Sequence, residues 1–339
     1  MSGAASPAAH VPSPATVHPR WGIAATGGIA ARFATGLREL GATVAAVASR
    51  DQARADAFAD RYGIPRRHAS YASLAADPDV DVVYVASPHA LHEADTLLFL
   101  AAGKHVLCEK PFALHSSQAR RMVEAARAAG LFLMDAVWSR FLPAYELLRQ
   151  VLAEGRVGTP LLVDADLGWP VPLDPAHRLY DRALGGGALL DLGIYPLQLI
   201  SLVLGPPDRV EGAGHLGETG VDEQVAAVLH HPGGGLGVAR ASIQAPLSCG
   251  GRIAGTEGWV EVPPLVHAPT HLVVARDGRA ERIDCGFAGE GLRFEAAEVE
   301  RCLAAGLTES PIMPLDETLS LMATLDAVRA AIGLTYPGE

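Results

Sequence analysis

The amino-acid sequence predicts an α/β protein in two parts: a doubly wound parallel sheet, then an α/β domain with a large open, mostly antiparallel sheet. Two observations support this fold class. Up to about residue 140, short apolar runs alternate with stretches of helical periodicity, which is typical of right-handed βαβ units. From residue 161 onward, short apolar runs follow one another with Gly, Pro and Asp turns between them, as in antiparallel sheets.

Composition and charge limit the possible classes of protein. The chain has 339 residues, more than one ordinary domain, and its 49% of hydrophobic residues can form a sizeable core. The net charge of −11 argues against a nucleic-acid partner, because phosphate backbones require a basic surface. No apolar run approaches ~18 residues and no leader pattern begins the chain, so we expect no membrane partner and a cytoplasmic location. The four cysteines form no C-x-x-C pair, which predicts reduced thiols.

The N-terminal part is expected to form the parallel sheet. Residues 1–20 are rich in Ala, Ser and Pro and are expected to be a flexible tail. The run 80–85 is apolar on both faces, as a central parallel strand should be. We expect strands at 23–25, 43–48, 80–85, 104–107 and 131–136, and helices at 29–40, 52–62, 71–76, 91–102 and 116–129.

The second part is expected to span residues 141–339, because the segment from Trp138 to Pro143 interrupts the alternation that marks residues 21–140. We expect one face of its sheet to cover helices and the other to meet a second subunit. The expected strands are 161–167, 208–215, 224–231, 235–244, 252–262, 272–275 and 280–285, and the expected helices are 144–154, 185–204, 294–305 and 316–332.

A glycine turn between the first strand and helix is a candidate phosphate site. Such a turn aims backbone N–H groups and a helix N-terminus at a pyrophosphate. The G-x-G-x-x-G fingerprint would fall on Ala25, Gly27 and Ala30, so only the middle glycine is present, and an ordinary turn is the alternative. The candidate cofactor residues here are Thr26, Gly27, Gly28 and Ile29.

The second strand ends in Ser49-Arg50 rather than in a carboxylate. An acidic residue at this place binds the ribose of NAD, whereas an arginine suits the 2′-phosphate of NADP. We therefore expect NADP(H) rather than NAD(H). The alternative is that Arg50 pairs with Asp51 or Asp56 at the start of the next helix.

Lys110 follows a buried strand and lies between Glu109 and Pro111. The carboxyl edge of an open α/β sheet is where ligands bind, so this lysine is a candidate proton or charge donor, with a plain surface lysine as the alternative. A second group, Ser87, Pro88, His89 and His92, follows the central strand and is expected beside the cofactor. No cysteine or carboxylate completes a ligand set with the histidines, so no metal is expected.

The apolar segment 185–204 has only two ionisable side chains, Asp191 and Tyr195, four residues apart. On a buried helix they would share a face, and the carboxylate would need a cation such as Lys110. At ~4 Å, Lys110 would attract a tyrosinate by about 4 kcal/mol, which would bring the pKa of Tyr195 toward neutrality. Pro196 is expected to kink the helix after Tyr195. The alternative is a capping aspartate with a core tyrosine.

Together, these motifs resemble the Gfo/Idh/MocA oxidoreductase family. The resemblance rests on the opening turn, Glu109-Lys110-Pro111, the segment from Gly186 to Tyr195, and Glu309-Ser310-Pro311. The segments 132–141 and 218–222 are most similar to the branch of dimeric dihydrodiol dehydrogenases and NADP-dependent D-xylose dehydrogenases. The likeness extends from Trp21 to Pro337.

The resemblance implies an N-terminal Rossmann domain that binds NADP(H) and a C-terminal domain whose open sheet forms a homodimer or homotetramer. It also implies that Lys110, Asp191 and Tyr195 surround the carbon that exchanges hydride, with Tyr195 as general acid/base, Lys110 lowering its pKa and Asp191 holding a substrate hydroxyl. The implied substrate is a sugar, polyol or cyclic diol; the alternatives are a cofactor-dependent glycoside hydrolase or a non-catalytic regulator.

Further contacts are expected from two sets of residues. The cofactor set adds Glu109, Lys110, Trp138 and Arg140 to the residues of the turn and strand ends named above. The insert 169–177 and the loop 265–271 look unlike close relatives where substrate should bind. The candidates for lining the substrate site are Trp138, Arg140, Trp169, His177 and Arg178, together with Asp191 and Tyr195.

Overall fold

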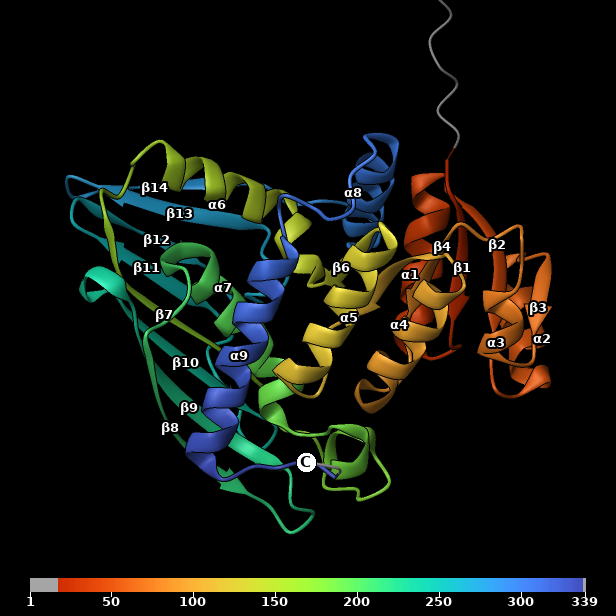
Figure 1. The fold of residues 1–339 in the computed structure, drawn as a ribbon. Coiled ribbons are helices and arrows are strands. Elements are labelled where there is room, and N and C mark those ends of the chain that lie inside the picture. The colour runs from red at the N-terminus through yellow and green to blue at the C-terminus, as the bar shows by residue number, and fades with distance from the viewer. Residues whose placement is uncertain (1–17, 338–339) are drawn as a thin grey trace, which may run out of the picture.

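The computed structural model describes residues 18–337 and is organised by two sheets (Figure 1). The flexible tail predicted for residues 1–20 lies outside the described residues except for its last three, and Arg20 begins the first strand. The first sheet ends at Ala136 and the second begins at Pro160. The predicted boundary at residue 140 therefore falls between the two sheets.

The first sheet is fully parallel, with the strand order β3-β2-β1-β4-β5-β6. The order reverses between β1 and β4, and in doubly wound sheets ligands bind at the carboxyl ends of the strands beside such a reversal. The strand β3 was not predicted because its three residues, Arg-Arg-His, are polar and lie at the edge. The bounds are β1 (Arg20–Ala24), β2 (Thr43–Ala48), β3 (Arg66–His68), β4 (Val82–Val85), β5 (His105–Glu109) and β6 (Leu133–Ala136).

Helices connect these strands, and their apolar stripes pack on the sheet. In α1, for example, Ala30, Phe33, Ala34 and Leu37 are buried at helical spacing. The helix ends at Gly41, whose φ of 76° suits a residue without Cβ. The helices are α1 (Gly28–Leu40), α2 (Gln52–Tyr62), α3 (Tyr71–Ala75), α4 (His92–Ala101) and α5 (Ser116–Ala129), with short 3₁₀ turns η1 (His89–Leu91) and η2 (Trp138–Phe141).

The second sheet has the order β14-β13-β12-β11-β7-β10-β9-β8 and is antiparallel except where β7 pairs with β10. The single strand predicted at 252–262 is wrong: it is two strands, β11 and β12, joined at Thr256-Glu257. The run Gly255-Thr256-Glu257-Gly258 contains no large apolar residue and marks the turn, but this signal was overlooked. The bounds are β7 (Pro160–Gly168), β8 (Arg209–Leu216), β9 (Asp222–His230), β10 (Leu236–Ser242), β11 (Gly251–Gly255), β12 (Gly258–Val262), β13 (His271–Arg276) and β14 (Arg279–Asp284).

One face of the second sheet is covered and the other carries exposed side chains. The helices α6 (Pro143–Ala153), α7 (Ile194–Leu204) and α9 (Leu315–Ile332) lie between this sheet and the N-terminal part (Figure 1). The other face exposes Leu162, Val228 and Leu236 by 42%, 38% and 38%. Leu162 and Leu236 are direct neighbours across the β7–β10 pair. This face therefore combines exposed apolar side chains with charged ones, such as the ion pair between Arg240 and Asp164.

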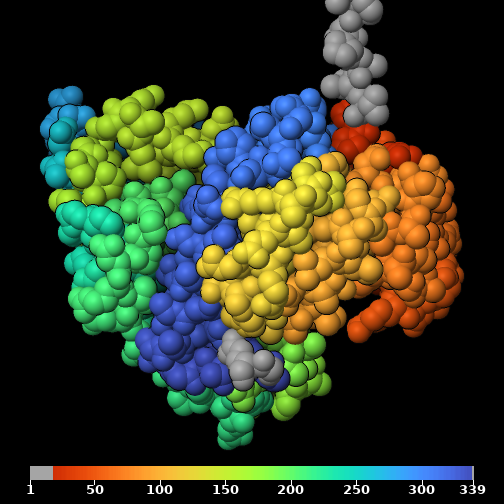
Figure 2. Space-filling model, viewed as in Figure 1, coloured from red at the N-terminus to blue at the C-terminus, as the bar shows by residue number. Residues whose placement is uncertain are grey.

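The two C-terminal helices join the two parts of the molecule. Helix α8 (Arg293–Ala304) packs on α1, and α9 packs on both α5 and β8. Figure 2 shows the blue C-terminal residues directly against the yellow residues of α5. The C-terminal part thus returns to the Rossmann-like sheet and holds the cleft between them in place.

Within residues 18–337, one stretch, Arg182–Leu204, is long and apolar enough to cross a membrane by length and composition alone. Of its apolar window, 78% is buried inside the molecule. A core helix passes the same test, so this is weak evidence for a span. The expected absence of a membrane partner and the expected cytoplasmic location stay predictions.

Candidate active site

A cavity of about 780 Å³ opens at the carboxyl ends of β1, β2, β4 and β5. It brings together most of the residues predicted for a cofactor, and its deep end contains Lys110 and Asp191. Its walls also include residues that were not predicted, among them Arg32 and Arg54. The predicted residues that line it are Thr26, Gly27, Gly28, Ile29, Ser49, Arg50, Ser87, Pro88, His89, His92, Glu109, Lys110, Arg178 and Asp191.

The glycine turn fits a pyrophosphate. Gly27 precedes α1 in an extended conformation, and no side chain caps the helix N-terminus. A Cβ added at Gly27 or Gly28 would meet nothing within 4 Å, so the backbone here is open to the cavity. Free N–H groups and the helix dipole at such a place attract anions. Ala25 adopts a φ of 107°, the left-handed conformation that a glycine would adopt at the first position of the fingerprint without strain.

Two arginines mark the end of β2. Arg50 and Arg54 are exposed and line the cavity beside Ser49. Asp51 caps α2 by accepting the backbone N–H of Ala53 at 2.9 Å, and in the part of the chain that the structure describes neither Asp51 nor Asp56 forms an ion pair with Arg50. The alternative interpretation of Arg50 is therefore wrong. Arg54 was not predicted, although it lies only four residues after Arg50, in the first turn of α2.

Asp191 is buried among three cationic or ionisable groups. The Lys110 ammonium lies 3.3 Å from Asp191 Oδ1 and donates to the Asp191 carbonyl at 2.9 Å. The Arg178 guanidinium bridges both carboxylate oxygens, at 3.0 and 3.3 Å, and His89 Nε2 lies at 3.9 Å. Burial opposes ionisation, but the charges of Lys110 and Arg178 outweigh it and hold the pKa of Asp191 well below its usual range. The predicted pairing of Asp191 with Lys110 is present.

The two bases next to Asp191 differ in charge: Lys110 is positively charged and His89 is neutral. Burial disfavours the charged form of Lys110, but Asp191 outweighs burial and raises the pKa of Lys110, so the ammonium is charged at neutral pH. Burial lowers the pKa of His89 to about 3, which keeps its ring neutral. His89 Nδ1 lies 3.0 Å from the Gly185 carbonyl and therefore donates to it as the neutral N–H tautomer. The site thus has a fixed positive charge at Lys110.

Tyr195 lies on the other side of Lys110. The ammonium is 5.0 Å from the centre of its ring, and Trp138 Nε1 donates to its hydroxyl at 2.9 Å. Burial raises the pKa of Tyr195, and Lys110 opposes this rise only in part. The predicted lowering of the pKa is therefore wrong, because burial of the phenol outweighs the attraction of Lys110, and the charges of Glu109 and Asp191 add to the rise. Tyr195 is a phenol at neutral pH.

The segment that carries Asp191 and Tyr195 is not a regular α-helix. A π-turn, η5 (Leu189–Gly193), precedes α7, which begins at Ile194. The kink predicted after Tyr195 is wrong: Pro196 lies in the first turn of α7, where proline is tolerated, and the irregularity precedes it. π-turns are frequent at functional sites. The turn presents the Asp191 carboxylate and the Tyr195 ring on two sides of the same ammonium.

Two predicted contacts lie elsewhere. Arg140 is fully buried and donates to Gln198 Oε1 at 2.5 Å and to Glu317 at 2.6 Å, so it joins η2 to α7 and α9. His177 is exposed and accepts the N–H of Leu179 at 3.3 Å, which caps the 3₁₀ turn η3 (Arg178–Tyr180). Neither Arg140 nor His177 lines the cavity, and their assignment to the site stays a prediction.

An aromatic group extends the site beyond Tyr195. The ring of His267 lies 5.2 Å from Tyr195, 5.9 Å from Trp138 and 6.2 Å from Trp169, between ring centres. The guanidinium of Arg32 lies 5.4 Å from the Trp138 ring. Trp138 and Trp169 do not line the cavity and instead form this group. His267 was not named, although it lies in the loop 265–271 that was expected near the substrate; Arg32 was missed, and no local pattern marks it.

His92 and Glu109 hold the loops of the cavity. His92 is buried, and its two ring nitrogens each lie 2.9 Å from a carbonyl, of Pro111 and of Ser87. Glu109 accepts the backbone N–H of Lys110 at 3.1 Å and the hydroxyl of Tyr84. These contacts tie the end of β4 to the end of β5 and fix the backbone that presents Lys110.

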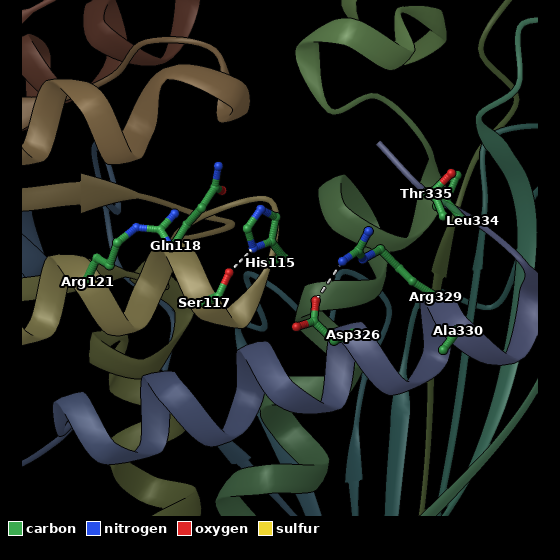
Figure 3. Close-up of a pocket in the computed structure, with 9 residues that line it drawn as sticks. All are labelled: His115, Ser117, Gln118, Arg121, Asp326, Arg329, Ala330, Leu334 and Thr335. Carbon is green, nitrogen blue, oxygen red and sulfur yellow. Dashed lines mark hydrogen bonds and ion pairs between the residues drawn. The ribbon is translucent and has the colours of Figure 1, made fainter. Parts of the chain in front are cut away.

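Among residues 18–337, no group of three or more His, Cys, Asp or Glu side chains is placed to hold a metal ion. A second cavity of about 700 Å³ lies between α5, α9 and the C-terminal segment (Figure 3). None of the predicted site residues lines it. It is lined by His115, Ser117, Gln118, Arg121, Asp326, Arg329, Ala330, Leu334 and Thr335.

Comparison with known families decides the class. Residues 19–136 match the model of the oxidoreductase family with an NAD-binding Rossmann fold, and residues 145–261 match the GFO/IDH/MocA C-terminal domain. The chain belongs to the GFO/IDH/MocA oxidoreductase family. The predicted enzyme class, an NAD(P)-dependent dehydrogenase or reductase, and the predicted fold are thereby confirmed.

Individual relatives of this GFO/IDH/MocA protein are oxidoreductases by name, in agreement with the family assignment. The chain is 44% identical to trans-1,2-dihydrobenzene-1,2-diol dehydrogenase of Bos taurus, over 94% of this chain and 98% of that one. The human enzyme of the same name is 42% identical over the same shares. Among solved structures, an aldose-aldose oxidoreductase from Caulobacter crescentus matches with a TM-score of 0.85 and 26% identity, covering 93% and 97% of the two chains. A 3-ketoreductase from Actinomadura kijaniata, solved with NADP and TDP-benzene, matches with 0.81 and 28%, covering 93% and 98%.

Proposed function

We propose that this protein is an NADP(H)-dependent dehydrogenase that transfers hydride between the nicotinamide and the CH–OH carbon of a cyclic diol, polyol or sugar. The observation that supports it most strongly is that Lys110 and Asp191 meet in the wall of a cavity that also contains the glycine turn, and that the ring of Tyr195, which does not line this cavity, lies 5.0 Å from the Lys110 ammonium. The names of its relatives, a dihydrodiol dehydrogenase and an aldose oxidoreductase, point to the same substrate class.

The bound cofactor would supply or accept the hydride, and the residues of the chain would handle the proton. In oxidation, the phenolate form of Tyr195 would accept the proton of the substrate hydroxyl while the hydrogen on the same carbon leaves as hydride, so that a carbonyl product would remain. Lys110 donates to the reacting oxygen and stabilises its negative charge in the transition state. The Asp191 carboxylate accepts a hydrogen bond from a substrate hydroxyl. Because Arg178 already bonds both oxygens of this carboxylate, the hydroxyl must share one of these oxygens with Arg178.

The charge state of Tyr195 determines the pH dependence. Its raised pKa means that the phenol is present at neutral pH and is ready to donate a proton in the reduction direction. Oxidation requires the phenolate, so its rate should rise with pH. Reduction should be favoured at lower pH. Opposite slopes for the two directions are the expected result of initial-rate measurements.

The preference for NADP(H) is supported by the end of β2. Ser49, Arg50 and Arg54 form a cationic corner of the cavity, and the nearby carboxylate, Asp51, is occupied as a helix cap. This corner matches the charge of a 2′-phosphate, and NAD lacks that group. We therefore propose a lower KM for NADP⁺ than for NAD⁺.

The aromatic group shapes the proposed substrate. The rings of Trp138, Trp169 and His267 gather beside Tyr195, and Asp191, the other partner of Lys110, forms an ion pair with Arg178. A ring with one apolar face and two neighbouring hydroxyl groups fits this combination. Cyclic trans-diols should therefore be better substrates than open-chain polyols.

The test is the absorbance of the reduced nicotinamide in the presence of NADP⁺ or NAD⁺ and a panel of cyclic diols, aldoses and inositols. We expect reduction of NADP⁺ by at least one cyclic diol. Equal use of both cofactors would remove the argument from Arg50. Cleavage of a glycoside without net cofactor reduction would replace the dehydrogenase with the hydrolase alternative.

We also propose that the open face of the second sheet is the contact between subunits of a homodimer or homotetramer. Leu162, Val228 and Leu236 are exposed in one area of it, and large exposed apolar patches mark interaction surfaces. Light scattering of the wild type and of Leu162→Asp tests this. A wild-type monomer would contradict the proposal.

A further inference from the structure

Asp222 contacts the start of η5, the π-turn that contains Asp191, and takes no part in the proposed chemistry. It is the first residue of β9, at the end of the Glu218–Asp222 motif, and it is fully buried. A buried carboxylate requires specific partners, because water cannot stabilise its charge. The partners of Asp222 are therefore a guide to its role.

The main partner is the backbone of the π-turn. Asp222 Oδ2 accepts the N–H of Leu189 at 2.6 Å, and Leu189 is the first residue of η5. No side chain from within η5 caps this turn. The N–H groups of Ala188 and of Asp222 itself also stabilise the negative charge. Asp222 thus caps the segment that leads to Asp191 and Tyr195.

Gly187 makes room for this cap. Its φ is 117°, and a Cβ built on it would lie 2.0 Å from Asp222 Oδ1. Gly186 is equally confined: its carbonyl accepts the hydroxyl of Tyr336 at 2.9 Å, and a Cβ would lie 2.6 Å from the carbonyl oxygen of Leu179. The backbone before η5 is therefore held by β9, by the C-terminal segment and by η3.

Arg329 is the one charged side chain that favours the ionised form of Asp222 among the described groups that act on it. This arginine belongs to α9 and also forms part of the wall of the second cavity, beside Asp326 (Figure 3). The residues 187–189 contribute only backbone groups. The neighbouring Glu223 follows in the same strand and so faces the opposite side of the sheet, where it bonds Gln244.

The other carboxylate oxygen, Oδ1, has no hydrogen-bond partner among the described residues and is the atom that a proton would occupy. Burial raises the pKa of Asp222 to about 7, although Leu189 and Arg329 oppose the rise. The carboxyl therefore changes its charge near neutral pH.

We propose that Asp222 is a positioning residue whose ionised carboxylate clamps the start of the π-turn and so holds Asp191 and Tyr195 against Lys110, and that protonation of Asp222 loosens this clamp. The inference rests on the proposed function, which assigns those two residues to the reacting centre. It adds a control of activity by pH that is separate from the titration of Tyr195.

The clamp has opposite effects on activity and stability. A carboxylate is a stronger acceptor than a carboxylic acid, so kcat rises as the pH increases through the pKa of Asp222. An acid whose pKa is raised by folding stabilises the protein below its unfolded value of about 3.9, and this contribution is lost as the pH rises through about 7. Activity therefore increases over the range in which stability decreases.

Three variants test the proposal through the pH profile of kcat. Asp222→Ala removes the acceptor and should lower kcat about 10- to 100-fold, the effect of a lost hydrogen bond to a charged group. The KM for the cofactor should not change, because no cofactor residue contacts Asp222. Asp222→Asn keeps an acceptor oxygen and should lose less kcat, but the step near pH 7 should disappear. Glu223→Gln is the matched control and should keep that step.

A second measurement does not depend on the variants or on the substrate. Hydrogen exchange of the wild type, corrected for intrinsic rates, reports the protection of the peptide that contains Leu189. We expect this protection to increase as the pH rises through 7, and to be independent of pH in Asp222→Asn. Unchanged protection across this range, or an unchanged kcat step in Asp222→Asn, would overturn the clamp. If no dehydrogenase activity is found on any substrate, the proposed function fails while the exchange experiment still tests the clamp.

Discussion

The two walls of the cavity are built in different ways. The cofactor wall consists of three short segments, 26–29, 49–54 and 87–89, each directly after a strand of one sheet, and it offers backbone N–H groups and exposed arginines. The proposed reacting wall joins Lys110 of the first sheet to Asp191 of the second part, and these charges are buried and mutually paired; the ring of Tyr195 lies next to this wall, 5.0 Å from the Lys110 ammonium. The first wall attracts a charged ligand. The second positions a proton donor.

The largest expected effect is on the reacting wall, at Tyr195. We expect Tyr195→Phe to lower kcat by about 10²- to 10⁴-fold, the usual contribution of a general acid or base. The loss of one hydroxyl should leave cofactor binding intact, because the ring keeps its place over Lys110. Stopped-flow or steady-state kcat and fluorescence titration of the cofactor measure the two quantities.

Tyr62→Phe, on the surface of α2, is the control for this substitution and should keep wild-type kcat. Full turnover of Tyr195→Phe would remove the proton-transfer role from this residue. A parallel loss of cofactor affinity would instead show that the two walls are not independent, which would break the comparison.

The second effect is on the cofactor wall. We expect Arg50→Ala and Arg54→Ala each to raise the KM for NADP⁺ by about 10- to 100-fold, because a charge-assisted hydrogen bond contributes roughly 1.5–3 kcal/mol. The KM for NAD⁺ should change little, and kcat should remain within about twofold. Arg38→Ala, in the last turn of α1, is the matched control. Equal changes for both cofactors would contradict the assignment of a 2′-phosphate to this corner.

The strands of the first sheet were predictable because parallel strands are buried on both faces and so appear as apolar runs. β2 was predicted with its observed bounds, and the edge strand β3 was missed because it has no apolar residue. In the second sheet, the alternation predicts strands but not the turn that separates β11 from β12. Local chemistry therefore predicted the elements better than their connections.

The same distinction applies to the site. Lys110 and the residues of the glycine turn were predictable, since each follows a strand. Arg140 does not line the cavity, and its partners, Gln198 and Glu317, are distant in sequence, so no local pattern could show that this arginine is buried among them. The pKa of Tyr195 was predicted with the wrong sign, because a sequence does not show how completely the phenol is buried, and burial outweighs the attraction of Lys110. Pairing and burial are tertiary properties.

The third prediction concerns the carboxyl groups behind the reacting wall. Glu295 of α8 is fully buried, and neither of its carboxylate oxygens has a hydrogen-bond partner among residues 18–337. Burial, together with the charges of Glu109 and Asp135, raises its pKa well above the usual value. The contribution of Glu295 to the free energy of unfolding is therefore fully present below the pKa that this carboxyl has in the unfolded chain. It is lost as the pH rises through the higher pKa of the folded protein.

We expect Glu295→Gln to remove this loss, at roughly 1.4 kcal/mol for each unit by which the pKa is raised. The free energy of unfolding in urea, measured from pH 5 to pH 9, should decrease less in the variant than in the wild type. Glu124→Gln, exposed on α5, should follow the wild-type profile. Parallel profiles for Glu295→Gln and the wild type would show that this carboxyl is solvated, and the contrast between an open and a buried wall would weaken.

The smallest expected effect returns to the cofactor wall, at Ala25. Its φ of 107° lies where a Cβ is strained, and its N–H donates to the Ala48 carbonyl at 3.0 Å, so the backbone cannot relax without losing a bond between β1 and β2. Glycine at this place removes the strain but adds entropy to the unfolded chain, so we expect Ala25→Gly to stabilise the protein by about 1 kcal/mol at most. Urea unfolding measures this change, and Ala31→Gly, inside α1, should instead destabilise by about 1 kcal/mol.

If Ala25→Gly is as destabilising as Ala31→Gly, the turn is held by its surroundings alone and the conformation costs nothing. A gain in stability with an unchanged KM for the cofactor would mean that the backbone of this wall keeps its shape with either residue, as expected for a site made of N–H groups rather than side chains.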